Sequence, residues 1–268
     1  MSRPHRAPTI GIIGGSGLYS FLEHAEPVHV TTPYGEPSEP VVVGEVAGRH
    51  VAFLPRHGAD HRFPPHAIPY RANLWALRAV GVRQVLAPCA VGGLQAELGP
   101  GSLVVPDQLV DRTSGRPQTL HETGAVHVSF ADPYCPVGRA AVVHAARGWP
   151  AVDGGTMVVI EGPRFSTRAE SQWFSRQGWS VVNMTGHPEA VLARELALCY
   201  TAIALVTDLD AGVESAGAVT QEEVFRVFGE NTDRLRAVLH EVIAALPEDR
   251  ACPCPAALDG IEHDLVLP

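Results

Sequence analysis

The stretch Thr9-Ile-Gly-Ile-Ile-Gly-Gly-Ser-Gly17 places a short apolar run with β-branched residues directly before a glycine turn. This pattern predicts a buried strand that ends where backbone N–H groups can approach a ligand. Ser20 stands where a dinucleotide-binding fingerprint has its third glycine, so the pattern is incomplete for that class. Two interpretations stay open: a plain tight turn, or an anion site in which the Ser16 hydroxyl donates.

The same alternation of short β-rich runs and helical runs continues along the chain, with no repeat and no low-complexity linker. It predicts a single α/β domain over residues 1–268. Further strands are predicted over 28–32, 40–46, 50–54, 84–89, 103–105, 156–160, 181–184 and 200–206. Helices are predicted over 71–80, 167–177, 188–196 and 221–246.

Composition excludes several classes of function. The chain has 268 residues, of which 46% are hydrophobic and 18% charged, enough for a sizeable core. It contains no lysine, which excludes a Schiff-base lysine, a pyridoxal-phosphate lysine and the lysine of a P-loop. The net charge is −9 and the arginines are scattered, so we expect no nucleic-acid partner.

No hydrophobic run approaches the length of a membrane span, so we expect no membrane association. Residues 1–9 lead straight into the first strand rather than into a signal-peptide apolar region, which favours a cytoplasmic protein. Five cysteines do not make a secreted disulfide framework. Cys252-Pro-Cys254 near the C-terminus could close a local disulfide, but we expect reduced surface thiols in a reducing compartment.

Five predicted strands end in small or polar residues, which suggests one assembled ligand site. In open α/β sheets, ligands bind outside the carboxyl ends of the strands. The endings are Gly14–Gly17, Arg56-His57, Cys89-Ala90, Met184-Thr185 and Asp208–Asp210.

Two of these endings carry a specific chemistry. The Arg56 guanidinium offers forked donors that match phosphate, and His57 adds another, although a surface pair is the alternative. Asp208 and Asp210 flank one residue at a strand end, where such a pair of carboxylates can raise the pKa of one member and give a neutral acid at pH 7. A solvated loop or a cation site is the alternative for the acids. Glycosidase chemistry is disfavoured because its carboxylates must flank the sugar.

Two other site classes find little support. His61 and other nearby histidines fit no metal-binding spacing, and Pro64-Pro65 would break a helix carrying them, so we expect no metal. A nucleophilic hydrolase lacks its Gly-x-Ser-x-Gly elbow.

Taken together, the motifs resemble those of methylthioadenosine phosphorylases, in order and over nearly the whole chain. The matching segments are 11–18 (GIIGGSGL), 56–58 (RHG), 70–77 (YRANLWAL), 107–113 (DQLVDRT), 161–171 (EGPRFSTRAES), 183–185 (NMT) and 207–210 (TDLD). The resemblance implies the purine nucleoside phosphorylase fold, a central mixed twisted sheet flanked by helices. It also implies a homotrimer or a dimer of trimers.

The resemblance also assigns expected roles to individual residues. The phosphate-binding positions are Ser16, Arg56, His57, Cys89, Ala90 and Thr185. The nucleoside-binding positions are Met184 at the ribose, Asp208 and Asp210 at the purine, Phe165 and Ser166 near the base, and His61, His127 and the C-terminal Leu-Val-Leu tail around the 5′ end. Gln221 stands at a position that is commonly valine in the methylthio-specific enzymes.

The expected activity is phosphorolysis of 5′-methylthioadenosine, or of a related adenosine with a 5′ substituent such as a halogen. Asp208 is the expected general acid toward purine N7, and no metal or organic cofactor is needed beyond the co-substrate phosphate. The paired acids favour adenine over hypoxanthine, since an ionised carboxylate facing O6 would be an unpaired acceptor. The alternatives are a broader adenosine or purine nucleoside phosphorylase in purine salvage, a hydrolytic nucleosidase, and a nucleoside-binding protein without turnover.

Overall fold

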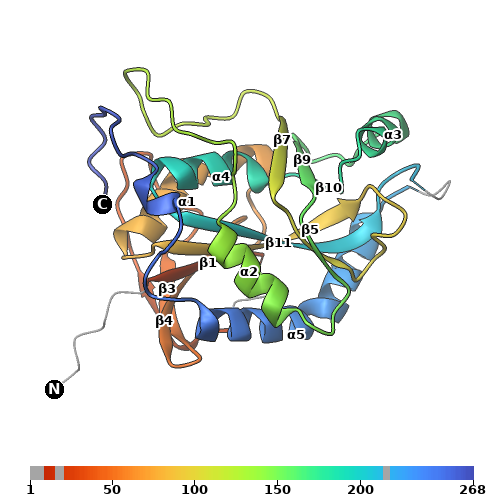
Figure 1. Cartoon of the computed structure of the whole chain (residues 1–268), viewed down its shortest axis with the longest axis horizontal. Coiled ribbons are helices and arrows are strands. Elements are labelled where there is room, and N and C mark those ends of the chain that lie inside the picture. The colour runs from red at the N-terminus through yellow and green to blue at the C-terminus, as the bar shows by residue number, and fades with distance from the viewer. Residues whose placement is uncertain (1–8, 16–20, 214–217) are drawn as a thin grey trace.

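A computed structural model describes residues 9–15, 21–213 and 218–268 (Figure 1). Ser16 lies outside these ranges. The described strands are β1 (Ile10–Gly14), β2 (Glu23–Val28), β3 (Val41–Val46), β4 (Arg49–Pro55), β5 (Gln84–Gly93), β6 (Leu103–Val105), β7 (Gln108–Arg112), β8 (Ala151–Asp153), β9 (Thr156–Ile160), β10 (Val181–Asn183) and β11 (Cys199–Leu209). The helices are α1 (Tyr70–Ala79), α2 (Pro136–Ala145), α3 (Arg168–Arg176), α4 (Gly186–Glu195) and α5 (Gln221–Ala245), with 3₁₀ turns η2 (Pro65–Ala67) and η3 (Cys254–Ala256).

The 11 described strands form one mixed sheet that divides at β5. One path runs β2-β3-β4-β1-β5-β10-β9-β7, and β11 pairs with the other edge of β5 and leads to β6 and β8. The strands β4, β1, β5 and β11 are mutually parallel neighbours, while β10 meets the end of β5 antiparallel. Because β5 and β11 pair along almost their whole length, they form the centre of the domain.

Helices cover both faces of this sheet, as the α/β pattern predicts. In Figure 1, α4 lies above the strands and α5 below them. Neighbouring residues of β1 supply opposite faces: Ile13 packs in the cluster that includes α1 and α4, and Ile12 in the cluster that includes α2 and α5. This alternation gives the period of two that a strand buried on both faces requires.

The expected α/β fold with a mixed sheet flanked by helices is therefore confirmed, with local corrections. The strand expected over 28–32 is wrong: β2 is Glu23–Val28, a fully exposed edge strand on β3, so no buried apolar pattern marks it. The strand expected over 84–89 continues to Gly93. The elements β7, β8 and α2 were not predicted.

Threonine side chains cap the starts of two helices. The Thr167 side chain accepts from the backbone N–H of Glu170, whose carboxylate accepts from Thr167 N–H, a complete capping box at α3. Thr220 likewise accepts from Glu223 N–H at the start of α5. No described helix is long and apolar enough to cross a membrane.

Candidate active site

One cavity of about 370 Å³ lies where the polar strand endings meet, a volume typical of small-molecule sites. Of the residues expected in the site, it is lined by Arg56, His57, His61, Cys89, Ala90, Phe165, Ser166, Met184, Thr185, Asp208, Asp210 and Gln221. Gly15, next to Ser16, also lines it. The structure therefore brings together side chains that the sequence spreads over more than 160 residues.

A β-bulge aims Asp208 into the cavity. The pairing of β11 with β5 shifts register between Val206 and Asp208, and such bulges redirect a side chain next to a site. Thr207 Oγ1 donates to Asp208 Oδ1 at 2.8 Å. Burial nevertheless raises the pKa of Asp208 to about 6, opposed by the Thr207 hydrogen bond and assisted by the nearby charge of Asp210. Asp208 is thus poised to exchange a proton near neutral pH.

Asp210 is a buried acceptor whose second oxygen is unused. Its side chain is buried, its backbone N–H donates to Gly93 O at 2.9 Å, and its Oδ2 has no hydrogen-bond partner among the described residues. Burial raises the pKa of Asp210, opposed by the hydroxyls of Ser166 and Ser171. A buried oxygen without a donor is costly, so it marks where a ligand N–H would bind.

Glycine at position 92 leaves room for the two acids. A Cβ built on Gly92 would lie 3.2 Å from Asp208 Oδ2 and 3.3 Å from the Cβ of Asp210. Any side chain there would press on both carboxyl groups. Gly92 lies two positions after the predicted Cys89-Ala90 ending. Its closeness to Asp208 and Asp210 becomes visible only once β5 and β11 are paired.

Arg56 enters the site differently from the expectation. Its guanidinium is buried and directs its fork at Glu189, with Nε–Oε1 at 2.5 Å and Nη2–Oε2 at 3.0 Å. Nη2 also donates to Ile13 O at 3.0 Å and Nη1 to Pro88 O at 3.3 Å. The bidentate face is thus occupied by a carboxylate, and only the remaining Nη1 hydrogen is left to reach an anion.

Glu189 is a functional neighbour that sequence analysis missed. It lies in α4, is fully buried, and also accepts from the Tyr200 hydroxyl at 2.8 Å. It holds the Arg56 charge in place at the wall of the cavity. The one signal in the sequence is an acidic residue in the first turn of an otherwise apolar helix. Its pairing with Arg56 could not be read, because 133 residues separate the two.

The His57 ring is neutral, and its orientation is fixed. Its Nδ1 lies 2.9 Å from Phe63 O, and since a carbonyl only accepts, Nδ1 carries the proton. Burial lowers the pKa of His57 to about 4, although the Phe63 hydrogen bond opposes the shift. Nε2 therefore keeps a lone pair that can accept a hydrogen bond from a P–OH group.

Two further positions of the expected phosphate site supply neutral groups. Burial raises the pKa of the Cys89 thiol to about 12, so it is a weak neutral donor. The Thr185 hydroxyl is buried and lies 3.3 Å from Asn183 Oδ1, which also accepts from the backbone N–H groups of Thr185 and Gly186 at 2.7 Å. Asn183 thereby orders the turn that ends β10 and presents Thr185.

Arg116 fixes the two segments beside the expected ribose position. It is buried and donates to Glu161 O and His187 O at 2.7 Å and to Met184 O at 2.9 Å. The backbone at Gly162 has a φ of +63°, and a Cβ there would lie 2.6 Å from the sulfur of Met184. Only glycine fits this close approach. Arg116 also pairs through Nε with Glu161 Oε1 at 3.1 Å, and it was not predicted, because all its partners lie in distant segments.

The start of α5 closes the cavity with an apolar face. Gln221, Val224, Phe225 and Phe228 all line it, at the i, i+3, i+4, i+7 spacing of one helix face. This spacing is visible in the sequence, but of these four residues only Gln221 was predicted to line the site. The His61 ring packs on Phe225, with centroids 6.1 Å apart.

His127 does not line the cavity and is exposed. The C-terminal tail packs Leu265 and Leu267 against the core that contains α1 and α4, while Val266 is 84% exposed. Their expected roles at the 5′ end across a subunit interface therefore stay predictions.

The expectation of reduced surface thiols near the C-terminus needs correction. All five cysteines are free, but Cys254 is buried and Cys252 is half-buried. Among the described residues, one group of three or more His, Cys, Asp or Glu side chains has the spacing of a metal site: Cys135, Cys199, Cys252 and Cys254. It lies outside the cavity.

Comparison with known proteins identifies the family. Residues 9–244 match the model of the Phosphorylase superfamily. A purine nucleoside phosphorylase of Streptomyces coelicolor is 64% identical, with 97% of each chain covered. An S-methyl-5′-thioadenosine phosphorylase of Mycolicibacterium smegmatis is 58% identical over 97% of this chain and 99% of its own.

Solved structures agree with these relatives. A methylthioadenosine phosphorylase from Schistosoma mansoni in complex with adenine has a TM-score of 0.85 and 37% identity, covering 88% of this chain and 91% of its own. One from an antarctic soil metagenomic library has a TM-score of 0.84 and 42% identity, covering 94% and 91%. The family match and these near-complete relatives show that this chain is an enzyme of the phosphorylase superfamily.

Proposed function

We propose that the enzyme cleaves 5′-methylthioadenosine, or a closely related adenosine with another 5′ substituent such as a halogen, with inorganic phosphate. A phosphate oxygen attacks C1′ as the C1′–N9 bond breaks, which yields adenine and the 5-substituted ribose 1-phosphate. The observation that carries the proposal is Asp208, a carboxyl whose pKa is raised to about 6, at the end of β11 in a cavity with Arg56 and Thr185.

Asp208 is the proposed general acid. Negative charge builds on the purine as the glycosidic bond stretches, and protonation at N7 relieves it. A carboxyl with a pKa of about 6 holds its proton in a useful fraction of molecules near pH 7. The proton leaves Asp208 with the departing base, and solvent restores it after release.

The phosphate is proposed to bind at the opposite side of the cavity. The remaining Nη1 hydrogen of Arg56, the Thr185 hydroxyl and the Ser16 hydroxyl donate to it, and Cys89 and Ala90 line the pocket. His57 Nε2 accepts a hydrogen bond from the P–OH group of a monoprotonated phosphate. Because Glu189 already balances Arg56, the site offers oriented donors more than net positive charge.

Asp210 and Asp208 support the choice of adenine. The unpartnered Oδ2 of Asp210 can accept from a 6-amino group, whereas a 6-oxo group would bring a second acceptor against it. Removing such a donor costs on the order of 1–3 kcal/mol. Phe165 and Ser166 line the cavity on the same side and complete the proposed base pocket.

The α5 face supports an apolar 5′ substituent. Val224, Phe225 and Phe228 offer it hydrocarbon surface, and Gln221 contributes one polar amide to the same face. The alternative is a broader adenosine or purine nucleoside phosphorylase, in which Gln221 binds a 5′-hydroxyl. The name of the Streptomyces relative favours that alternative.

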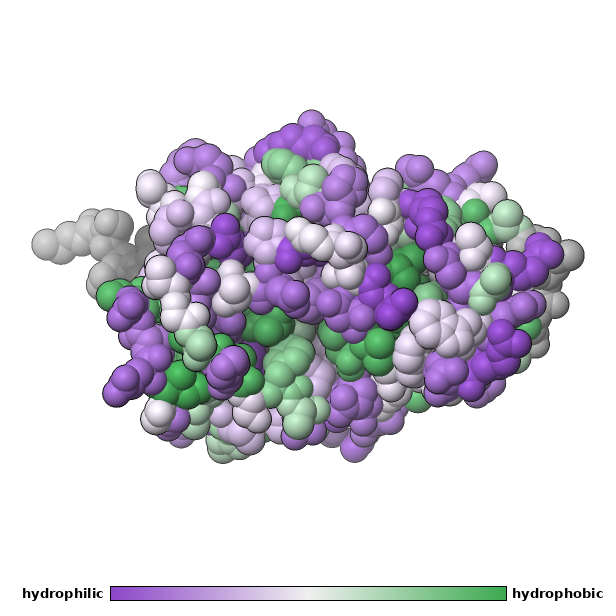
Figure 2. All heavy atoms as spheres, turned by 90° about the horizontal axis from the view of Figure 1, so that it is seen from above, coloured by the Kyte–Doolittle hydropathy of each residue, from purple (hydrophilic) through white to green (hydrophobic). Residues whose placement is uncertain are grey.

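The oligomeric state and the location of the enzyme are also proposals. We propose a homotrimer or a dimer of trimers in the cytoplasm, in which His127 and the C-terminal tail of one subunit approach the 5′ end in another. The face in Figure 2 carries several separate hydrophobic patches, and such patches can mark contacts between chains. The proposed reaction needs no metal or organic cofactor in the cavity.

The deciding experiment incubates the enzyme with 5′-methylthioadenosine, adenosine or inosine, each with and without phosphate, and follows free base by chromatography. We expect phosphate-dependent release of adenine, fastest from methylthioadenosine. An equal rate with adenosine would move the assignment to the broader phosphorylase. An equal rate with inosine would contradict the role of Asp210, and release without phosphate would overturn phosphorolysis itself.

A further inference from the structure

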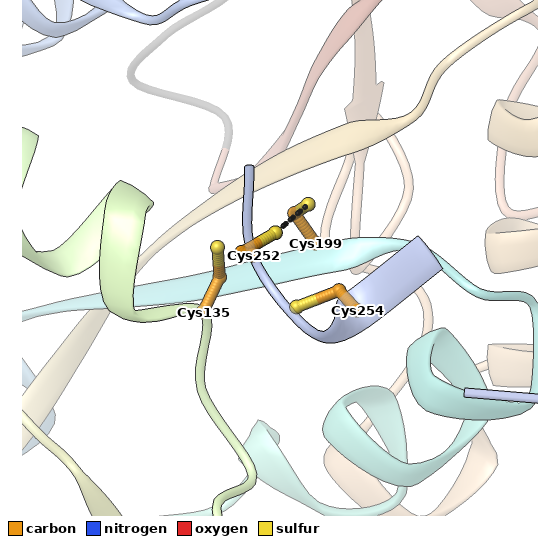
Figure 3. Close-up of side chains that lie close together, drawn as sticks. All are labelled: Cys135, Cys199, Cys252 and Cys254. Atoms are coloured by element: carbon orange, nitrogen blue, oxygen red, sulfur yellow. Dashed lines mark hydrogen bonds between the residues drawn. The ribbon is translucent and has the colours of Figure 1, made fainter. Parts of the chain in front are cut away.

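Four of the five cysteines meet at one point of the fold (Figure 3). Their sulfur atoms all lie within 4.8 Å of one another. This four-cysteine cluster consists of Cys135 before α2, Cys199 at the start of β11, and Cys252 and Cys254 near the C-terminus. Asp208 lies nine residues further along β11 than Cys199, a separation of about 30 Å along an extended strand. The cluster therefore has no direct part in the proposed reaction.

Buried cysteines often serve as small apolar core residues, which is the simplest alternative. The composition of this cluster argues against it. Among the residues that the structure describes, its buried members are all cysteines, and the partly buried hydrophobic residues packed against them are Val137 and Cys252. An apolar core would use aliphatic side chains here, whereas three separate segments each bring sulfur.

The spacing fits a single metal ion. Tetrahedral zinc holds thiolates at about 2.3 Å, which places the sulfurs about 3.8 Å apart. The Sγ atoms of Cys199 and Cys252 are 3.4 Å apart, and no pair exceeds 4.8 Å, so small side-chain movements reach this geometry. The cluster leaves no room for a second metal or for inorganic sulfide. Tetrahedral sites of four thiolates favour zinc among the common divalent ions.

The surroundings suit the charge that such a site would carry. Four thiolates around a divalent ion have a net charge of −2, which is costly to bury without positive partners. The carbonyl oxygen of Arg83 accepts from Cys199 N–H at 3.0 Å and from Arg250 Nη1 at 3.4 Å, so a guanidinium lies beside the cluster. The guanidinium of Arg78 lies near those of Arg83 and Arg250, and its Nε and Nη1 are buried without hydrogen-bond partners among the described residues. These arginines repel one another, which favours a neighbouring anion.

We propose that the four-cysteine cluster binds one Zn²⁺ ion per chain and thereby anchors the C-terminal segment to α2 and β11. Each thiol that binds loses its proton to solvent, so binding strengthens as pH rises. The ion replaces the apolar core that this corner of the molecule lacks. It is structural, and it leaves the proposed phosphorolysis free of metal.

The test measures metal in the full-length protein, purified with a reductant, loaded with Zn²⁺ and freed of excess by gel filtration. We expect about one zinc per chain by mass spectrometry. The double variant Cys252→Ser/Cys254→Ser should lose it. The matched control is Cys89→Ser, because Cys89 is the one cysteine outside the cluster and its loss should leave the zinc content unchanged.

A second readout does not depend on whether the variants fold. Wild-type protein loaded with Co²⁺ should show the intense visible bands of a tetrahedral tetrathiolate, and Zn²⁺ should remove them. A chelator should lower the Tm of the zinc-loaded wild type. Reduced wild type that binds neither ion would overturn the proposal. So would thiol titration in denaturant that finds one free thiol among the five, since the cluster would then be two disulfides.

Discussion

Replacing Asp208 by asparagine separates its acid function from its shape. The free carboxyl group has a pKa of 3.8, and burial raises it to about 6. That shift increases the protonated fraction at pH 7 about a hundredfold. Asparagine keeps the oxygen that accepts from Thr207 but cannot donate a proton to N7. We expect the Asp208→Asn variant to lose roughly two to four orders of magnitude in kcat.

The same substitution should raise stability at high pH. Because the folded pKa lies above the unfolded value, ionisation of Asp208 destabilises the fold. This loss of free energy of unfolding is absent well below pH 3.8 and grows as pH rises to about 6. Two pKa units correspond to about 3 kcal/mol at most. Urea unfolding should therefore show the variant more stable than wild type at pH 7.5, with the difference almost gone at pH 4.

The assay records kcat/KM from pH 5 to 9 for both proteins. Phosphate itself titrates near pH 7, so the variant serves as its control and the difference isolates Asp208. Wild-type kcat/KM should fall as pH rises through a pKa of about 6, and the variant should lack this fall. A variant that retains more than a tenth of wild-type kcat would refute the acid role. A stability difference that does not change with pH would refute the burial argument.

Three other substitutions test the site. Glu189→Ala leaves Arg56 buried without its carboxylate, so we expect a loss of about 3–5 kcal/mol in urea unfolding. Phosphate should restore more stability to this variant than to wild type, and equal shifts would contradict the pairing. Phe225→Ala should raise KM for methylthioadenosine more than for adenosine in steady-state assays, and an equal change would remove Phe225 from the 5′ pocket. Gly162→Ala should displace Met184 and weaken nucleoside binding in calorimetry, whereas unchanged affinity would contradict the close approach.

The sequence predicted much of the site because its chemistry lies at the ends of buried strands. A strand such as β11 is marked by a long apolar run, and the residues that follow it, Asp208 and Asp210, stand out as polar. The position of each side chain within one element could therefore be read directly. The resemblance to a known family then assigned roles that spacing alone left open.

Contacts between distant segments could not be read in this way. The fork of Arg56 was expected to face phosphate, yet it binds Glu189, and nothing local in either segment encodes that pairing. Arg116 was not predicted because it binds main-chain oxygens and the Glu161 carboxylate, which lie 44 or more residues away along the chain. Exposed β2 was misplaced because an edge strand buries no side chains. The four-cysteine cluster needed the full tertiary structure, since three segments contribute to it.

The residues that line the cavity range from Gly15, near one end of the chain, to Phe228 in α5, near the other. Its central strands, β5 and β11, pair although more than a hundred residues separate them. Contacts of such long sequence separation form slowly, because loop closure must precede them. During synthesis the ribosome must therefore release nearly the whole chain before any active site exists. A truncated chain would expose unpaired strand edges instead of a weakened enzyme, and we expect it to aggregate.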